Sequence, residues 1–312
     1  MLRATDDLIA AGFAPEAARA GLDAVAARYA VAIPPTLARL IDDPDGPIGR
    51  QFIPAAAEID TAPFELTDPI GDDAHEVLPG LVHRYPDRVL LKPLLICPTY
   101  CRFCFRRTHV GPDGGVLGAD ALAAALAYIR RTSRLREVIL TGGDPLMLSP
   151  RRLAGIIAEL SAMPHLEGLR LHTRVPIAMP ERLDDALVAA LATPKSLFVV
   201  LHANHAAELT EAASAALARL REAGIPILSQ TVLLRGVNDD LTALADLFRA
   251  LLRQRVKPYY LHQLDPAPGT ARFHVPIAEG QALLRALRGQ ISGTALPRYV
   301  FDTPSGKIDI AP

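Results

Sequence analysis

The feature that most constrains this chain is a regular alternation of apolar, β-branched runs with amphipathic helical stretches after about residue 80. Continuous apolar runs separated by helices are typical of a parallel sheet whose strands are buried on both faces. The pattern predicts strands at 89–96, 137–140, 168–172, 197–202, 225–233 and 257–262, and a last strand near 297–301. It predicts helices at 119–132, 149–162, 181–192, 206–223, 239–253 and 277–290.

Six βα units are too few for a complete eight-stranded barrel. The prediction is therefore an α/β fold with an incomplete, open (βα)6 barrel. Parallel barrels build their sites at the C-terminal ends of the strands, and polar residues gather at those ends here. They are Cys97, Gly142, Gly143, Asp144, Arg174, His202, Asn204, Gln230 and Asp265. The same alternation thus predicts the fold and the edge that carries the site.

The first 80 residues follow another pattern. Residues 1–47 are rich in alanine and have apolar residues at helical spacing, interrupted by prolines, whereas residues 48–78 look like a loop. We expect an N-terminal helical and loop extension over 1–80, packed on the barrel. The partial barrel is expected over 81–312, with a C-terminal loop that carries Lys307.

Composition narrows the class of protein. The chain has 312 residues, 50% of them hydrophobic, which is enough for a sizeable core. The net charge is −1 without long charged runs, so binding to nucleic acid or a membrane surface has no electrostatic support. No apolar stretch approaches the ~20 residues of a membrane span, and the N-terminus lacks the features of a signal peptide. We expect a cytoplasmic protein.

All three cysteines lie within eight residues, as Cys97, Cys101 and Cys104 in a CxxxCxxC motif. Thiolates hold iron–sulfur clusters, and a [4Fe–4S] cube normally takes four. Three ligands leave one iron open to a small molecule. A zinc site or chance clustering is the alternative, but structural zinc usually takes four ligands in paired motifs. The odd count and the tight loop disfavour a disulfide.

The spacing of the cysteines resembles that of the radical S-adenosylmethionine (SAM) enzymes. The sequence segments around the cysteines narrow the resemblance to the lysine 2,3-aminomutase family, including short bacterial members that serve the modification of elongation factor P. It runs from about Ile48 to Lys307 through the segments RYPDRVLLKPLLICPTYCRFCFRR, LTGGDPL, HTRVP, HANH, QTVLLRGVNDD, YYLHQLDPAPGTARFHVP and YVFDTPSGK. The resemblance implies a barrel of the radical SAM type.

The resemblance also implies cofactors and their ligands. Cys97, Cys101 and Cys104 hold a [4Fe–4S] cluster, and Gly142, Gly143 and Asp144 contact the amino group of SAM. Arg84, Tyr85 and Arg88 match positions that bind the phosphate of pyridoxal 5′-phosphate (PLP), a role that suits the planar guanidinium. His202 and Gln230 are weaker candidates for cofactor contact, and His172 and Arg174 stay ambiguous between a structural role and contact with the SAM carboxylate. For Asp144, a helix cap in a tight turn is the alternative.

PLP enzymes hold their cofactor through a lysine, and the four lysines of this chain can be compared as candidates for that role. Lys195 and Lys257 lie before or at the start of strands, at the rim opposite the predicted site, and Lys92 lies inside a strand. Lys307 is the best candidate by position and matches the family's PLP lysine, although its loop, PSGK, is shorter than the family's multi-glycine version. A solvated C-terminal lysine is the alternative.

Three residues bear on the substrate through the resemblance. Arg106 matches the arginine that pairs with the substrate carboxylate, and Asp265 and Asp302 match two carboxylates that receive the ε-ammonium of lysine. Two buried carboxylates need a cation, which favours L-lysine over glutamate. A structural arginine and two structural acids are the alternatives.

The function implied is an isomerase that converts L-lysine to β-lysine. A 5′-deoxyadenosyl radical removes a hydrogen, and the amino group migrates on PLP. A reductant such as flavodoxin or ferredoxin, and a homo-oligomer, are expected. The same chemistry on another amino acid, supply of β-lysine for elongation factor P, and a non-catalytic Fe–S protein are the alternatives.

Overall fold

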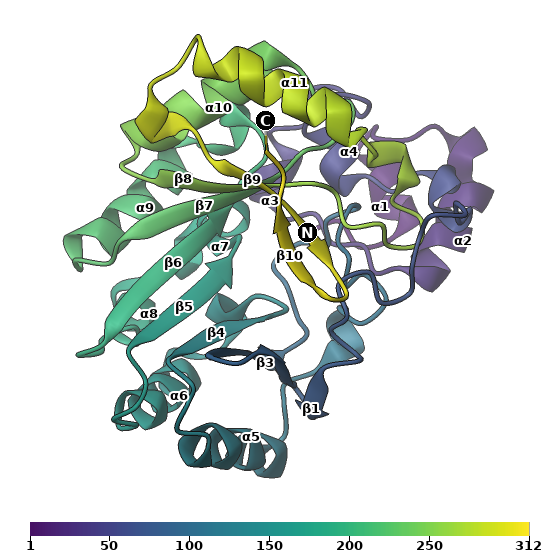
Figure 1. Cartoon of the computed structure of the whole chain (residues 1–312). Coiled ribbons are helices and arrows are strands. Elements are labelled where there is room, and N and C mark those ends of the chain that lie inside the picture. The colour runs from purple at the N-terminus through teal and green to yellow at the C-terminus, as the bar shows by residue number, and fades with distance from the viewer. Residues whose placement is uncertain (312) are drawn as a thin grey trace.

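The computed structural model describes residues 1–311, and its centre is one ten-stranded sheet whose strand order follows the chain (Figure 1). The strands are β1 (Glu76–Leu78), β2 (Leu81–Tyr85), β3 (Arg88–Leu94), β4 (Glu137–Gly142), β5 (Gly168–Thr173), β6 (Ser196–His202), β7 (Ile227–Val232), β8 (Lys257–His262), β9 (Arg298–Thr303) and β10 (Gly306–Asp309). Strands β3 to β9 pair in parallel, whereas β1–β2–β3 and β9–β10 are antiparallel. The sheet keeps two edges, so the incomplete barrel is confirmed.

Six helices cross over between the parallel strands and cover the outer face of the sheet. They are α5 (Ala119–Arg131), α6 (Pro150–Ser161), α8 (Asp185–Ala189), α9 (Glu211–Glu222), α10 (Leu241–Arg253) and α11 (Ile277–Arg288). Helix α6 illustrates the local cause: Ser149 caps its start, Pro150 occupies the first turn, and Leu153, Ile156, Ile157 and Leu160 are buried on one face. Helix α8 is shorter than the predicted 181–192, because Pro180–Arg182 form a separate 3-10 turn and Asp184, which accepts a hydrogen bond from the Leu187 amide, caps the start of the helix.

The N-terminal region shares the core of the barrel. Its helices are α1 (Thr5–Ala10), α2 (Arg19–Arg28), α3 (Pro35–Ala38) and α4 (Gly49–Phe52). Buried side chains of this region, including Ile33, Leu37 and Phe52, belong to the same hydrophobic cluster as the strands. The prediction of a loop over 48–78 was wrong in part, because this stretch contains α4 and β1.

Two hairpins at the sheet edges were not predicted. Arg84 lies in β2 and Arg88 begins β3, instead of both preceding the first strand. Lys307 lies in β10, a strand paired with β9, instead of in a loop. Side chains from β2 reach the second hairpin: Arg84 donates to the carbonyl of Thr303 at 2.9 Å, and the Tyr85 hydroxyl accepts from the Lys307 amide at 2.7 Å. Side-chain hydrogen bonds thus bridge the two edges.

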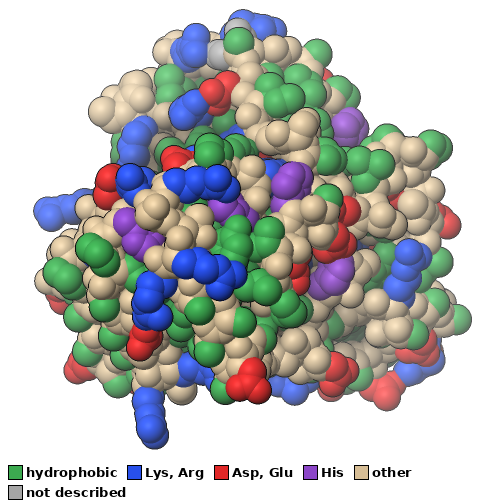
Figure 2. Space-filling model, turned by 60° about the horizontal axis from the view of Figure 1, so that its bottom comes forward, with side chains coloured by type: hydrophobic (Ala, Val, Ile, Leu, Met, Phe, Trp, Pro, Cys, Tyr) green, Lys and Arg blue, Asp and Glu red, His purple; other side chains and the backbone are tan. Residues whose placement is uncertain are grey.

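Acidic and basic side chains are scattered over the face drawn in Figure 2, with hydrophobic side chains between them. The net charge of the whole chain is −1. Within residues 1–311, no helix is both long enough and apolar enough to cross a membrane.

Candidate active site

A cavity of about 740 Å³ is lined by residues from the first positions of the parallel strands, such as Arg88 and Glu137, to the loops that follow their C-terminal ends. Its wall contains all of the site residues predicted from the sequence. They are Arg84, Tyr85, Arg88, Cys97, Cys101, Cys104, Arg106, Gly142, Gly143, Asp144, His202, Gln230, Asp265, Asp302 and Lys307. The fold therefore brings together residues that are up to 223 positions apart in the chain (from Arg84 to Lys307).

The three cysteines follow β3 on one loop, as free and partly buried thiols. Burial, followed by the nearby Asp144 carboxylate, raises the pKa of Cys97 well above its ordinary value, and burial raises that of Cys104 to about 11. Metal coordination would have to stabilise these thiolates. In residues 1–311, no three Cys, His, Asp or Glu side chains converge on a single metal ion.

Gly142 and Gly143 let the cysteine loop lie against the end of β4. Gly142 has φ = +109°, and a Cβ on it would come within 2.7 Å of the Leu94 carbonyl. A Cβ on Gly143 would overlap the backbone of Ile96. The two glycines thus lie against the backbone of the cysteine loop, whereas the sequence had indicated that they lie against a ligand. Asp144 accepts hydrogen bonds from the amides of Leu146 and Arg174 and from the Thr173 hydroxyl, so it is the cap of a tight turn.

Lys307 reaches the cavity despite its short loop. Register places it directly opposite Asp302 across the β9–β10 hairpin, and its ammonium forms an ion pair with that carboxylate. Arg84 also donates to Asp302 at 3.1 Å, and His262 Nδ1 lies 3.4 Å from it. Burial raises the pKa of Asp302, but the His262 hydrogen bond and the Lys307 charge outweigh it and hold the pKa far below its usual range.

Asp265 contrasts with Asp302. Its Oδ1 is buried and has no hydrogen-bond partner among the described residues. Burial, together with the charge of Asp302, raises the pKa of Asp265 to about 8. The sequence had indicated that both carboxylates need a cation. In the structure Asp302 is already paired with Lys307, whereas Asp265 has no ion-pair partner within residues 1–311.

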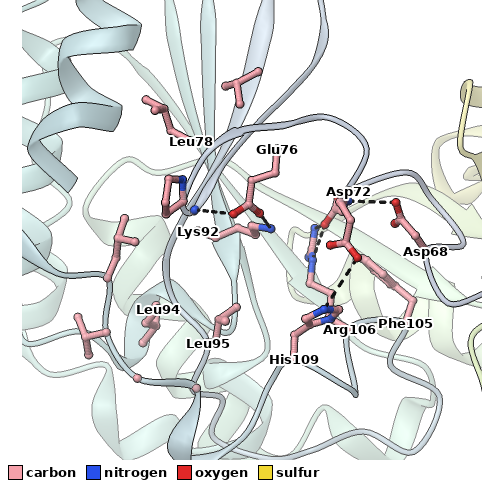
Figure 3. Close-up of a pocket in the computed structure, with 18 of the residues that line it drawn as sticks. Asp68, Asp72, Glu76, Leu78, Lys92, Leu94, Leu95, Phe105, Arg106 and His109 are labelled. Atoms are coloured by element: carbon pink, nitrogen blue, oxygen red, sulfur yellow. Dashed lines mark hydrogen bonds and ion pairs between the residues drawn. The ribbon is translucent and has the colours of Figure 1, made fainter. Parts of the chain in front are cut away.

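Arg106 already has a carboxylate partner, which the sequence did not reveal. Asp72 accepts from Arg106 Nε at 2.8 Å and lies 2.6 Å from its Nη2 (Figure 3). Arg106 Nη1 is 3.5 Å from the Thr141 hydroxyl. Asp72, Phe105 and Arg106 line both the main cavity and a second one of about 830 Å³. This ion pair therefore stands in the wall between two hollows.

The other lysines point away from the main cavity. Lys92 lines the second cavity and pairs with Glu76 at 2.5 Å (Figure 3). Lys195 donates to the carbonyl of Leu166, and Lys257 donates to the carbonyls of Thr294 and Leu296. Among the four lysines, only Lys307 lines the main cavity.

Several cavity residues carry buried nitrogen atoms without a partner in residues 1–311. They are His172 Nε2, His202 Nε2 and Arg174 Nε. Burial lowers the pKa of both histidines far below the ordinary value, so they are neutral. Gln230 lines the same wall. Unpaired buried donors and acceptors are costly, so these atoms indicate that the cavity accommodates a polar ligand.

A buried carboxylate behind the cysteine loop was also missed. Glu58 is fully buried and receives hydrogen bonds from Arg102, Arg107 and Arg272. Arg102 is 1% exposed and also donates to the carbonyl of Ala30. The N-terminal region therefore anchors the loop that carries the cysteines. The local signal in the sequence was an arginine, Arg102, inside the cysteine motif.

The comparison with known proteins agrees with this geometry. The sequence profile of the radical SAM superfamily matches residues 91–248. The L-lysine 2,3-aminomutase of Clostridium subterminale is 40% identical over 278 residues, which are 88% of this chain and 67% of that protein. This chain belongs to the lysine 2,3-aminomutase family. The glutamate 2,3-aminomutase of Clostridioides difficile (strain 630) is 34% identical over 284 residues, 90% of this chain and 67% of that protein.

Among solved structures, Streptococcus suis SuiB bound to S-adenosylmethionine superposes with a TM-score of 0.52 at 14% identity, over 73% of this chain and 52% of that one. This likeness confirms the fold of the radical SAM type. The chain spans between 57 and 76% of the length of the curated relatives that it matches.

The cavity suits the cofactors of the lysine 2,3-aminomutase family, which are a [4Fe–4S] cluster, SAM and PLP. Each thiolate of a cube binds a different iron, so cysteines that do not converge on one ion suit a cluster better than zinc. The unpaired nitrogens offer contacts to a polar ligand. In the same wall as Lys307, the guanidinium carbons of Arg84 and Arg88 lie 4.9 and 3.9 Å from the centre of the Tyr85 ring, with Arg84 paired with Asp302 and Arg88 with Asp87. Guanidinium groups are able to pair with phosphate oxygens.

Proposed function

We propose that this member of the lysine 2,3-aminomutase family converts L-lysine to β-lysine, as a radical SAM and PLP-dependent isomerase. The observation that carries the substrate is Asp265, a buried carboxyl group without a cation in the same cavity as Lys307 and the cysteines. The side-chain ammonium of lysine would supply that cation. The side-chain carboxylate of glutamate would instead bring a negative charge next to the Asp265 and Asp302 carboxyl groups, which argues against it.

Each predicted residue keeps its role within this proposal. Cys97, Cys101 and Cys104 hold the cluster, and the turn formed by Gly142, Gly143 and Asp144 contacts SAM. His202 and Gln230 contact a cofactor, and Arg84, Tyr85, Arg88 and Lys307 hold PLP. Arg106 binds the substrate carboxylate, Asp265 binds the substrate ammonium, and Asp302 contributes once Lys307 leaves it.

When bound, the cluster with SAM supplies a radical that removes hydrogen, and PLP carries the migrating amino group. The residues of the chain hold and orient these groups. Asp302, which also accepts a hydrogen bond from Arg84, keeps the Lys307 ammonium at the cavity wall, and Lys307 reacts only after it has lost a proton. Asp72 holds Nε and Nη2 of Arg106, so that Nη1, whose contact is a long one of 3.5 Å to the Thr141 hydroxyl, is the nitrogen that would meet the substrate. Burial of the cavity wall excludes competing reactions with water.

The proposal includes a one-electron reductant such as flavodoxin or ferredoxin, a cytoplasmic location and a homo-oligomer. The three free cysteines support a reducing compartment.

The direct test is an anaerobic assay of the reconstituted protein with SAM, PLP, dithionite and isotopically labelled L-lysine, with β-lysine detected by NMR. L-Glutamate and L-alanine are the comparison substrates. We expect β-lysine only when SAM and PLP are both present. Turnover of glutamate instead would refute the assignment of Asp265, and a full cluster without SAM cleavage would refute the radical enzyme.

A second test separates the cofactors. Lys307→Ala should lose bound PLP, measured by its visible absorbance after cluster removal, and should keep its iron content. Lys195→Ala is the matched control, because Lys195 lies outside the cavity. Equal PLP retention by both variants would contradict the role of Lys307.

A further inference from the structure

Arg174 makes direct contact with one of the three cysteines. It follows β5 and is 5% exposed, and its Nη1 lies 2.9 Å from the sulfur of Cys101. In residues 1–311, Cys101 is the cysteine whose sulfur accepts a hydrogen bond from a charged side chain. Cys97 and Cys104 have no such partner among the described residues. The environment of the three thiols is therefore asymmetric.

A fully buried network holds the guanidinium of Arg174 in place. Its Nη2 donates to Glu208 at 2.6 Å and to Gln51 at 2.7 Å, and both of these residues are 0% exposed. Asn204 donates to both residues as well: its side-chain amide donates to Gln51, and its backbone amide donates to Glu208. Turning Arg174 away from Cys101 would leave Glu208 as a buried charge without its cation, which is costly.

Aromatic rings fix the remaining faces of the guanidinium. Its carbon lies 4.7 Å from the centre of the Phe52 ring and 5.7 Å from that of Phe103. Phe52 comes from α4 of the N-terminal region and Phe103 from the cysteine loop itself. Three separate parts of the chain thus place one cation beside one sulfur.

We propose that Arg174 sets the reduction potential of the cluster through Cys101, and that Glu208 limits this effect. Hydrogen bonds to cluster sulfurs and the local charge are the main controls of such potentials. A cation beside a ligating sulfur favours the reduced cluster, which carries one more negative charge. Arg174 is a positioning residue in this scheme, and the inference rests on the proposed role of the cysteines.

The test is an EPR-monitored redox titration of the anaerobic, cluster-loaded protein without SAM. In Arg174→Gln, the equilibrium constant for reduction should fall about tenfold, which is a shift of about 59 mV to lower potential for one electron. Glu208→Gln should shift the potential in the opposite direction, because it removes the negative charge that opposes Arg174. These opposite signs distinguish electrostatic control from simple structural damage.

Arg170→Gln is the matched control. It removes an arginine of β5, the strand that Arg174 follows, and this arginine lines the cavity but pairs with Glu137. It should change the equilibrium constant for reduction less than twofold. If Arg174→Gln has the potential of this control, or if Arg174→Gln and Glu208→Gln shift together, the inference is wrong. If Arg174→Gln cannot hold iron, the test rests on the reduction potential of Glu208→Gln. A potential above that of the wild type supports the inference, and an unchanged potential overturns it. Wild-type protein without a cluster would contradict the proposed function instead.

Discussion

The sharpest test of the electrostatic reasoning is the substitution Asp265→Asn in protein without cofactors. Burial and Asp302 raise the pKa of Asp265 from 3.8 to about 8. Between these two values the folded state holds a proton that the unfolded state releases. Wild-type stability should therefore fall as the pH rises through this window. Asparagine has nearly the same shape and cannot ionise, so it should escape this penalty.

The magnitude follows from linkage, at about 1.4 kcal/mol for each pH unit. At pH 7, the proton that the folded state keeps on Asp265 and the unfolded state releases lowers the free energy of unfolding by about 4 kcal/mol, at pH 5 by about 2 kcal/mol, and below pH 4 by close to zero. We expect Asp265→Asn to be more stable than the wild type, with the largest gain at pH 7, a smaller gain at pH 5 and almost none below pH 4. Binding of L-lysine should weaken in the same variant, since the ammonium loses its carboxylate partner.

Urea unfolding at pH 4, 5 and 7 measures the difference, and Asp302→Asn is the matched control. The pKa of Asp302 is lowered by His262 and Lys307 in spite of burial. That group contributes stability above its unfolded value of 3.8, so its asparagine variant should be less stable at pH 7. The reasoning is refuted if Asp265→Asn is no more stable than the wild type at pH 7. It is also refuted if the gain does not shrink as the pH falls.

Two further predictions concern the support of the cysteine loop. Glu58→Gln should lower the free energy of unfolding by about 3–5 kcal/mol, because Arg102 and Arg107 would stay buried without a counter-charge. Urea unfolding measures this change. The control is Glu159→Gln, at an exposed ion pair with Arg130, which should change the free energy of unfolding by less than about 0.5 kcal/mol. Gly143→Ala should cost about 1–3 kcal/mol and reduce iron loading, because its Cβ would overlap Ile96. Gly155→Ala, in α6 with nothing within 4 Å, should instead be stabilising by about 0.5–1 kcal/mol, and equal effects of the two alanines would contradict the steric argument.

The strands and crossover helices of the barrel could be predicted because their signal is local. The predicted strand at 257–262 coincides with β8, and the strand at 168–172 differs from β5 by one residue. Both are short runs whose apolar residues have to be buried, and the neighbouring sequence alone reveals this. The two edge hairpins carry a weaker signal, because β10 pairs only with β9 and half of its residues are exposed.

The partners of the charged groups could not be predicted. Asp72 lies 34 residues from Arg106, Glu58 lies 44 residues from Arg102, and Glu208 lies 34 residues from Arg174. An acid in a loop or a short turn has no local feature that identifies a distant partner. Only the packing of the N-terminal region and the strand ends brings these groups within hydrogen-bond distance.

By itself, the sequence determined the order of the strands, the loop with the three cysteines and the edge at which the polar residues collect, because these depend on neighbours in the chain. Only the tertiary structure decided that Asp302 is paired with Lys307 while Asp265 stays without a cation. The same type of side chain thus has its pKa lowered at one position and raised at the other. Charge interactions and desolvation depend on distance and burial in space, which the linear order of residues does not specify.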